Sequence, residues 1–374
     1  MNFIVSSAAL YSHLQAISRV INSKNALPIL DCFLFELQGD VLSITVSDSE
    51  TTMKTSIPVQ ENSTEGKVAI AAKTLLDALK EIPEQPLSFS VSKDSLEVKV
   101  TYQNGQYSLI GQNADEYPKC AELGANQVGF VMGGETLLNG ITRTVFATAD
   151  DELRPVMNGV YFDITTDDIT MVASDGHKLV RYQLKDVKGK ERAAFILPKK
   201  PANLLKNILP KESGEVEIAF DERNAVFKLG NYHMICRLIE GRYPNYNSVI
   251  PKENPFKVIV DRVLLIGALR RVAIFSSQAS SLIKLKLANN SINISAQDID
   301  FSTSADESVV CQYEGNEMSI GFKSTFLIDI LSNMPSDEII IELADPSRAG
   351  VLVPGKQEEN ENLLSLLMPM MLND

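Results

Sequence analysis

The chain has 374 residues, a formal net charge of −13 at pH 7 and 44% hydrophobic residues. This length predicts two or three domains, each large enough to bury a core. No apolar run reaches the roughly 18 residues of a transmembrane helix, and the N-terminal stretch lacks a basic segment before an apolar one, so neither a span nor a signal peptide is expected. The acidic charge argues against an ordinary nucleic-acid-binding domain, because such domains are usually basic.

The cysteines Cys32, Cys120, Cys236 and Cys311 stand far apart and form no CxxC pair. This spacing predicts neither a disulfide framework nor a zinc site, and isolated thiols in a reducing cytoplasm are expected instead. The histidines have no partners at metal-ligand spacing, so we expect no metal and no cofactor.

The first predicted elements are a strand at residues 3–5 and a helix that carries Leu10, Leu14 and Ile17. The i, i+4, i+7 spacing of these side chains is typical of a helix with one face on a core. A strand follows at 42–48, and a short helix begins near Lys73.

That short helix ends before Pro83, because proline cannot continue a helix. The alternating segments 87–92 and 96–101 then predict a β-hairpin.

The same order of elements recurs twice further along the chain. The second copy has a strand at 130–132, helix residues Leu137, Ile141 and Thr144, a strand at 169–175, a helix from Lys199 that stops before Pro210, and a hairpin of 215–220 with 225–229. The third copy has a strand at 258–260, helix residues Leu265, Leu269 and Val272, a strand at 292–298, and a helix from Lys323 that stops before Pro335.

The copies share one offset. Leu10, Leu137 and Leu265 are separated by 127 and 128 residues. Internal repeats at a fixed offset indicate one structural unit used several times. The sequence therefore predicts an α+β fold of three tandem domains at 1–125, 126–253 and 254–374, each with two helices packed on antiparallel sheets.

Basic residues recur on the predicted helices, whereas acidic residues concentrate in strands and loops. The helix-associated cations are Arg19, Lys24, Lys73, Lys80, Arg143, Lys199, Lys200, Lys206, Arg270, Arg271 and Lys323. Head-to-tail association of like domains closes into a ring when the rotation allows. A ring with a basic lining and an acidic exterior would reconcile DNA binding with the net charge, because lysine and arginine contact phosphates without regard to base sequence. The alternative is that these cations lie on ordinary solvated helix faces.

Three motifs carry a family resemblance that extends over the whole chain: Ala173-Ser-Asp-Gly-His-Lys-Leu179, Gly241-Arg-Tyr-Pro-Asn-Tyr246 and Met368-Pro-Met370. With them, the chain resembles the bacterial DNA polymerase III beta subunits, the beta sliding clamps. The resemblance implies three DNA-clamp domains per chain and a head-to-tail homodimer that forms a six-domain ring around duplex DNA. It also implies a cytoplasmic, non-catalytic processivity factor that tethers the polymerase alpha subunit and is opened by a clamp loader.

The resemblance further implies a hydrophobic pocket that binds a short motif in partner proteins. Its positions are Arg154, Met157, Ser174, Gly176, His177, Lys178, Leu179, Pro244, Val249, Phe326, Met368, Pro369 and Met370. Methionine side chains adapt to different partners, which suits such a pocket. The alternative for the segment 363–372 is an ordinary buried edge strand.

A dimer contact is likewise implied, with Tyr107 and Leu109 of the first domain against Ile274 and Phe275 of the third. The chain departs from the family pattern at Ser248, Ser280 and Met371 and in an acidic insert at 354–362. These departures leave the peptide preference open.

Two other functions remain as alternatives. Ser174, Asp175 and His177 superficially suggest a hydrolase, but no GxSxG segment surrounds the serine, and Asp175-Gly176 is typical of a hairpin turn. The second alternative is a scaffold of repeated domains that binds proteins without DNA.

Overall fold

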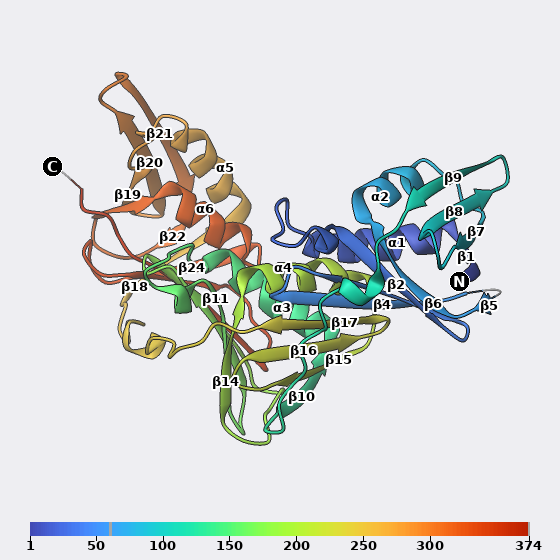
Figure 1. Ribbon diagram of the computed structural model, residues 1–374. Helices are drawn as coiled ribbons and strands as arrows, with labels where there is room; N and C mark the ends of the chain where they lie inside the picture. Colours follow the sequence, from blue (N-terminus) through green and yellow to red (C-terminus); the bar gives the residue numbers. More distant parts are fainter. Residues whose placement is uncertain (60–61, 373–374) are drawn as a thin grey trace. The chain divides into compact units, whose positions relative to one another are not determined.

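The computed structural model describes residues 1–59 and 62–372, and it contains the same succession of elements three times (Figure 1). The first repeat comprises β1 (Asn2–Ser6), α1 (Ser7–Ile17), β2 (Cys32–Gln38), β3 (Val41–Ser47), β4 (Thr51–Pro58), β6 (Gly66–Ala71), α2 (Ala72–Lys80), β7 (Pro86–Val91), β8 (Glu97–Tyr102) and β9 (Gly105–Ile110). The second comprises β10 (Val128–Gly133), α3 (Gly134–Thr144), β11 (Gly159–Ile164), β12 (Ile169–Ser174), β13 (Lys178–Leu184), β14 (Ala193–Pro198), α4 (Lys199–Ile208), β15 (Glu215–Phe220), β16 (Asn224–Leu229) and β17 (Tyr232–Arg237).

The third repeat follows the same plan. It comprises β18 (Phe256–Asp261), α5 (Arg262–Ala273), β19 (Leu282–Ala288), β20 (Ser291–Asp298), β21 (Thr303–Val310), β23 (Met318–Lys323), α6 (Ser324–Ser332), β24 (Glu338–Leu343), β25 (Gly350–Pro354) and β26 (Glu361–Leu367). Two short strands, β5 (Asn62–Thr64) and β22 (Gln312–Tyr313), are additions to the plan. The predicted α+β class and threefold repeat are confirmed.

The helices form where their caps and apolar spacing predict. Ser6 Oγ accepts a hydrogen bond from the Ala9 N–H (3.2 Å) at the start of α1, and Asp261 Oδ1 accepts one from the Leu264 N–H (2.8 Å) at the start of α5. The three residues that define the predicted face of α1, including Leu10, are fully buried. No helix of the described residues is both long and apolar enough to cross a lipid bilayer.

The chain divides into two compact units, one of residues 1–138 and 203–238 and the other of 139–202 and 239–374. The division falls within α3 and α4, so the second repeat contributes to both units. The limits predicted for the three domains fall in the connections that precede β10 and β18.

The first unit contains two antiparallel sheets. One has the strand order β5-β1-β7-β8-β9 and the other β10-β15-β16-β17-β4-β3-β2-β6. In the second sheet β17 pairs with β4, and Met234 lies opposite Met53. This pairing joins the last strand of the second repeat to the first repeat.

The second unit has an equivalent pair of sheets, with the orders β14-β11-β12-β13-β26-β25-β24-β18-β22 and β21-β20-β19-β23. Here β13 pairs with β26, and Val180 lies opposite Ser365. The buried strand expected in the C-terminal stretch is confirmed as β26, but it is not an edge strand, because it lies between β13 and β25. Figure 1 shows α5 and α6 together beside the four-stranded sheet.

The two inter-repeat pairings use equivalent strands. In each, the last strand of one repeat (β17 or β26) joins the third strand after the first helix of another (β4 or β13). The last strand of the first repeat, β9, and the third strand after the first helix of the third repeat, β21, have no such partner within the described residues. Within residues 1–59 and 62–372, β9 pairs only with β8, and β21 pairs only with β20.

Candidate functional site

The tight turn between β12 and β13 forms one side of the candidate pocket. Gly176 has φ +90°, a left-handed conformation that favours glycine, and an added Cβ would lie 2.9 Å from Arg154 Nη1. The Ser174 hydroxyl accepts a hydrogen bond from the Gly176 N–H (3.1 Å) and donates one to the Lys178 carbonyl (2.8 Å). The predicted hairpin turn is confirmed, and its backbone requires glycine at this position.

The Asp175 carboxylate organises the same turn. It accepts hydrogen bonds from the His177 N–H (2.9 Å), the Lys178 N–H (2.9 Å) and Lys178 Nζ (2.6 Å). Burial raises the pKa of Asp175, but the hydrogen bonds from Lys178 and His177 outweigh burial and bring the pKa below its usual value. The buried Lys178 ammonium is thereby paired, as a buried charge must be.

These contacts decide against the hydrolase alternative. The Ser174 hydroxyl donates to a carbonyl, and the Asp175 carboxylate bonds to backbone N–H groups and a lysine. The His177 ring lies 6.0 Å from the Phe326 ring, centroid to centroid. A catalytic triad needs the serine, the histidine and the carboxylate in one hydrogen-bonded chain, and here they make other contacts.

Phe326 on α6 is surrounded by the positive side chains of the pocket. The ammonium groups of Lys178 and Lys323 lie 4.1 Å and 4.7 Å from the centroid of its ring. Both contacts are within the range of cation–π attraction. The aromatic ring thus holds two cations at the edge of an apolar surface.

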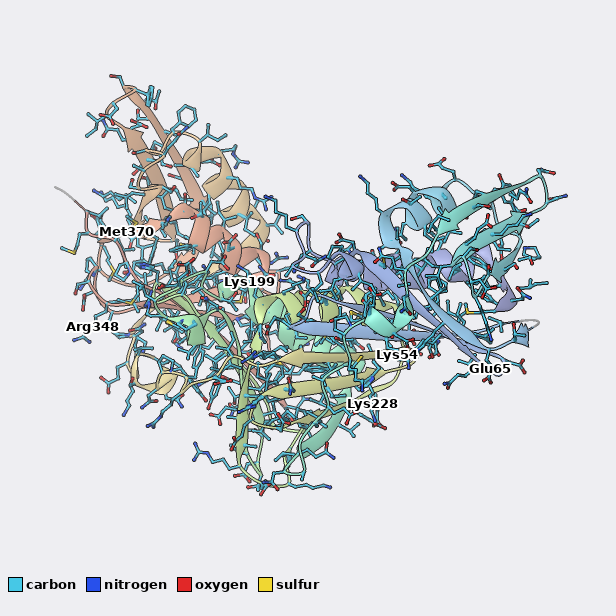
Figure 2. All side chains as sticks on the ribbon, in the orientation of Figure 1. Lys54, Glu65, Lys199, Lys228, Arg348 and Met370 are labelled. Atoms are coloured by element: carbon cyan, nitrogen blue, oxygen red, sulfur yellow. The ribbon has the colours of Figure 1, made fainter. Side chains whose placement is uncertain are left out.

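The C-terminal segment crosses from the turn to β23. The Met368 N–H donates to the His177 carbonyl (2.8 Å), and the Met370 N–H donates to the Gly321 carbonyl (2.8 Å). Pro369, between them, has no N–H to satisfy. Met368 is exposed and Met370 is half-buried, and Met370 is labelled in Figure 2. These bonds hold two flexible methionine side chains beside the turn.

An apolar cluster supports the floor and the remaining wall. Leu179 packs in it with Tyr243 and Leu366, and the Tyr243 ring stacks on Tyr161 at 4.7 Å. Pro244 follows Tyr243 directly and is exposed. In the 241–250 segment, Tyr243 is thus anchored in the apolar cluster, whereas Pro244 remains exposed.

All of the predicted pocket residues lie in the second unit, where His177 contacts Phe326 and Met368, and Arg154 lies beside Gly176. They come from five segments: Arg154 and Met157 around the short turn Pro155–Met157; Ser174, Gly176, His177, Lys178 and Leu179; Pro244 and Val249; Phe326 on α6; and Met368, Pro369 and Met370 after β26. Among them Met157 and Leu179 are buried, whereas Val249 and Met368 are exposed. Such a mixture suits a surface that accepts an apolar segment.

The predicted DNA-facing cations differ in how open they are. Exposed cations are Arg19, Lys24, Lys73, Lys80, Arg270 and Arg271; half-buried ones are Lys199, Lys200, Lys206 and Lys323. Lys199 Nζ pairs with Asp150 (2.6 Å), and Arg271 pairs with Glu307 through two nitrogens (3.0 and 2.5 Å). The Lys323 ammonium lies over the ring of Phe326, a residue of the candidate pocket.

The structure corrects the prediction for Arg143. Its side chain is 13% exposed, its Nη1 pairs with Glu361 Oε2 at 2.6 Å, and its guanidinium lies 4.6 Å from the centroid of the Tyr182 ring. Its position on the helix predicted an exposed cation that faces DNA, but Glu361 neutralises its charge inside the second unit. Arg143 therefore joins α3 to β26 rather than facing DNA.

Three family models together match nearly the whole chain. They are the N-terminal, central and C-terminal domains of the DNA polymerase III beta subunit, at residues 1–121, 132–245 and 247–371. The chain belongs to the DNA polymerase III beta subunit family. Its function is that of a sliding clamp.

Relatives support this membership at full length. A beta sliding clamp of Pseudomonas aeruginosa is 28% identical over 374 residues, and one of Pseudomonas putida is 27% identical over 373; both alignments cover 100% of each chain. A crystal structure of the Pseudomonas aeruginosa sliding clamp bound to griselimycin is 26% identical, covers 100% of both chains and has a TM-score of 0.93. The Thermotoga maritima beta subunit, 24% identical over 100% of both chains with a TM-score of 0.90, shows the same fold.

The residues predicted for a dimer contact of this clamp-family member lie on β9 and just after α5. Tyr107 and Leu109 are half-buried on β9, whereas Ile274 (77% exposed) and Phe275 (39%) follow the end of α5. Two exposed apolar side chains in succession are consistent with a covered surface in an assembly.

Sequence reasoning missed two residues that support the candidate pocket. Asp175 was not included, although an Asp-Gly pair after a strand is a known turn signal. Tyr243 was also missed, although a Tyr-Pro pair recurs at Tyr117-Pro118 in the first repeat. No group of three or more potential metal-ligating side chains occurs among the described residues.

Proposed function

We propose that two copies of this chain associate head to tail into a six-domain ring, that the ring encircles duplex DNA, and that it tethers a DNA polymerase through the pocket around Met370. The observation that carries the proposal is the repeated strand pairing. β17 with β4 and β26 with β13 are equivalent junctions, and β9 and β21 are the unmatched members of the same series. A second copy supplies the missing pairs at both ends, and the twofold assembly then leaves neither edge unpaired.

The helices of the three repeats carry the cations that would face DNA. Lys73 and Lys80 on α2 and Arg270 on α5 are exposed. Contacts from such side chains to phosphates are independent of base sequence and permit sliding. The acidic residues in strands and loops discourage DNA from binding to other surfaces of the protein, so the ring stays on DNA because it encircles it.

The pocket is suited to short motifs in partner proteins. Its methionines Met157, Met368 and Met370 can adapt to different apolar side chains, and backbone hydrogen bonds fix the segment that bears two of them. We propose the polymerase alpha subunit, a clamp loader and other motif-bearing proteins as its partners, and a cytoplasmic, non-catalytic role without cofactor. Peptide anchors of leucine or phenylalanine would supply most of the binding energy.

Retention on DNA of different topology tests the ring. The protein, loaded by its cognate loader, is expected to stay on closed circular DNA and to leave after the circle is cut once. Equal retention on the two forms would refute encirclement. A scaffold without DNA function would show no loader-dependent retention on either form.

A further inference from the structure

A concave surface lies next to the candidate pocket in the second unit. It is a cavity of about 670 Å³ on the four-stranded sheet, lined by residues of β19, β20 and β21 and by Leu372 of the C-terminal segment. Its side chains come from the sheet face opposite the helices: Ile283 and Leu285 are buried, whereas their neighbours Leu282 and Lys284 line the cavity. We call this surface the β19 groove.

The β19 groove adjoins the pocket at Gly321. A Cβ added to Gly321 would lie 2.7 Å from the Met370 carbonyl oxygen, 2.8 Å from Leu372 Cδ2 and 3.0 Å from Leu282 Cδ1. Met370 belongs to the candidate pocket, and Leu282 and Leu372 line the groove. Gly321 therefore lies against both Met370 of the candidate pocket and the two leucines of the groove.

The groove combines one half-buried cation with an apolar far end. Lys284 lies opposite Gly321 in the strand register, and its Nζ has no hydrogen-bond or ion-pair partner in the part of the chain that the structure describes. Asp306, the groove's carboxylate, already accepts a hydrogen bond from Asn293 Nδ2 (2.8 Å). Ile299, 79% exposed, lines the groove beyond β20.

We propose that the β19 groove binds the segment of a partner peptide that flanks the motif held in the pocket, with an acidic residue against Lys284 and an apolar residue against Ile299. This inference rests on the proposed peptide pocket. A linear segment that fills the pocket and continues past Met370 enters the groove directly. The Lys284 ammonium, nearer to Met370, favours an acidic residue in the peptide, and the exposed Ile299 beyond it favours an apolar residue.

The ring leaves this site accessible. A strand that pairs with β21 uses its backbone edge, whereas the groove uses side chains on the face of the sheet. The proposed subunit contact and the peptide segment can therefore occupy the same sheet together.

Fluorescence titration of the intact protein with three synthetic peptides tests the proposal. One contains only a core motif with leucine and phenylalanine anchors; the other two add a Glu-Ser-Leu-Ser segment at one end or the other. We expect one extended peptide to bind about tenfold tighter than the core, from one apolar contact and one partly exposed ion pair.

Matched variants locate the effect. Lys284→Glu and Ile299→Ser are each expected to remove about threefold to fivefold of the gain without changing binding of the core peptide. The controls are Lys286→Glu, two residues along the same face but outside the groove, and Val310→Ser, which is as exposed as Ile299. Neither control should alter the gain.

The outcomes separate the two proposals. If the core peptide does not bind, the proposed pocket itself is wrong. If the core binds but neither extension tightens binding, or if the control variants reduce the gain as much as the groove variants do, the groove assignment is wrong.

Discussion

Two serines provide a direct test of the proposed contact between chains, because the register of β9 against β21 can be derived from the two junctions within the chain. Met53 and Val180, in equivalent positions of β4 and β13, lie opposite Met234 and Ser365. The equivalent position on β21 is Ala305, because it pairs with Ala296 of β20 as Met53 pairs with Val46 and Val180 with Ala173.

The equivalent position on β9 is found in the same way. Tyr107 pairs with Val100 of β8, as Met234 pairs with Phe227 of β16. Tyr107 is therefore expected opposite Ala305 of a second chain, and antiparallel pairing then places Ser108 opposite Ser304. Both serines are exposed, so replacing them with cysteine should change stability by less than about 0.5 kcal/mol.

The expected geometry permits a disulfide at this pair but not at a control pair on the same strands. Directly opposite residues have Cβ atoms about 4.5–5.5 Å apart, within reach of a disulfide after small adjustment. The control pairs Ser108→Cys with Ser308→Cys, which lies on the same face of β21 but four residues away, or about 13 Å along the strand. That separation exceeds the roughly 7 Å between Cα atoms that a disulfide can bridge.

The assay is mild oxidation followed by non-reducing electrophoresis, in a Cys120→Ser background because Cys120 is the exposed cysteine among the four. The Ser108→Cys/Ser304→Cys protein should move to twice the 41.2 kDa mass of the chain, and the control should stay monomeric. Equal cross-linking of the two proteins, or none in a protein that is dimeric in solution, would refute the derived register.

Three further outcomes are expected. Met370→Asp should abolish binding of a motif peptide, because Met370 belongs to the proposed pocket, but it should leave the solution mass unchanged, because Met370 lies outside β9 and β21. Binding of the peptide to the variant would show that Met370 is not part of the pocket. Arg143→Ala should lower the free energy of unfolding in urea by about 3 kcal/mol, because it leaves the largely buried Glu361 carboxylate without its partner. Arg271→Ala breaks a solvent-exposed pair and should lower the free energy of unfolding much less. Similar losses in the two variants would contradict this contrast. Burial, with nearby lysines, lowers the pKa of both His13 and His233 below 6.5, so folding favours their neutral forms, and the free energy of unfolding should fall as the pH drops below about 6.5. His233→Gln should reduce this dependence of the unfolding free energy on pH, which is at most about 1.4 kcal/mol per pH unit per proton. An unchanged pH dependence would exclude His233 as a contributor.

Local patterns in the sequence determined most of the elements. Leu10, Leu137 and Leu265 belong to helices because each is followed by apolar residues at helical spacing, and each short helix that begins near Lys73, Lys199 or Lys323 ends before a proline. These signals act over one or two turns of chain, and they need no knowledge of the fold. The offset between copies then indicated the repeat, and Asp175-Gly176 indicated the turn between β12 and β13.

Only the tertiary structure decided which residues meet across long separations. The approach of Glu361 to Arg143 could not be predicted, because helical spacing describes one helix and not the strand that packs against it. It likewise could not place β26 between two strands, or bring Leu372 beside Leu282 to form the β19 groove. Strand order and side-chain contacts depend on pairing between distant segments, and local periodicity carries no information about the partner.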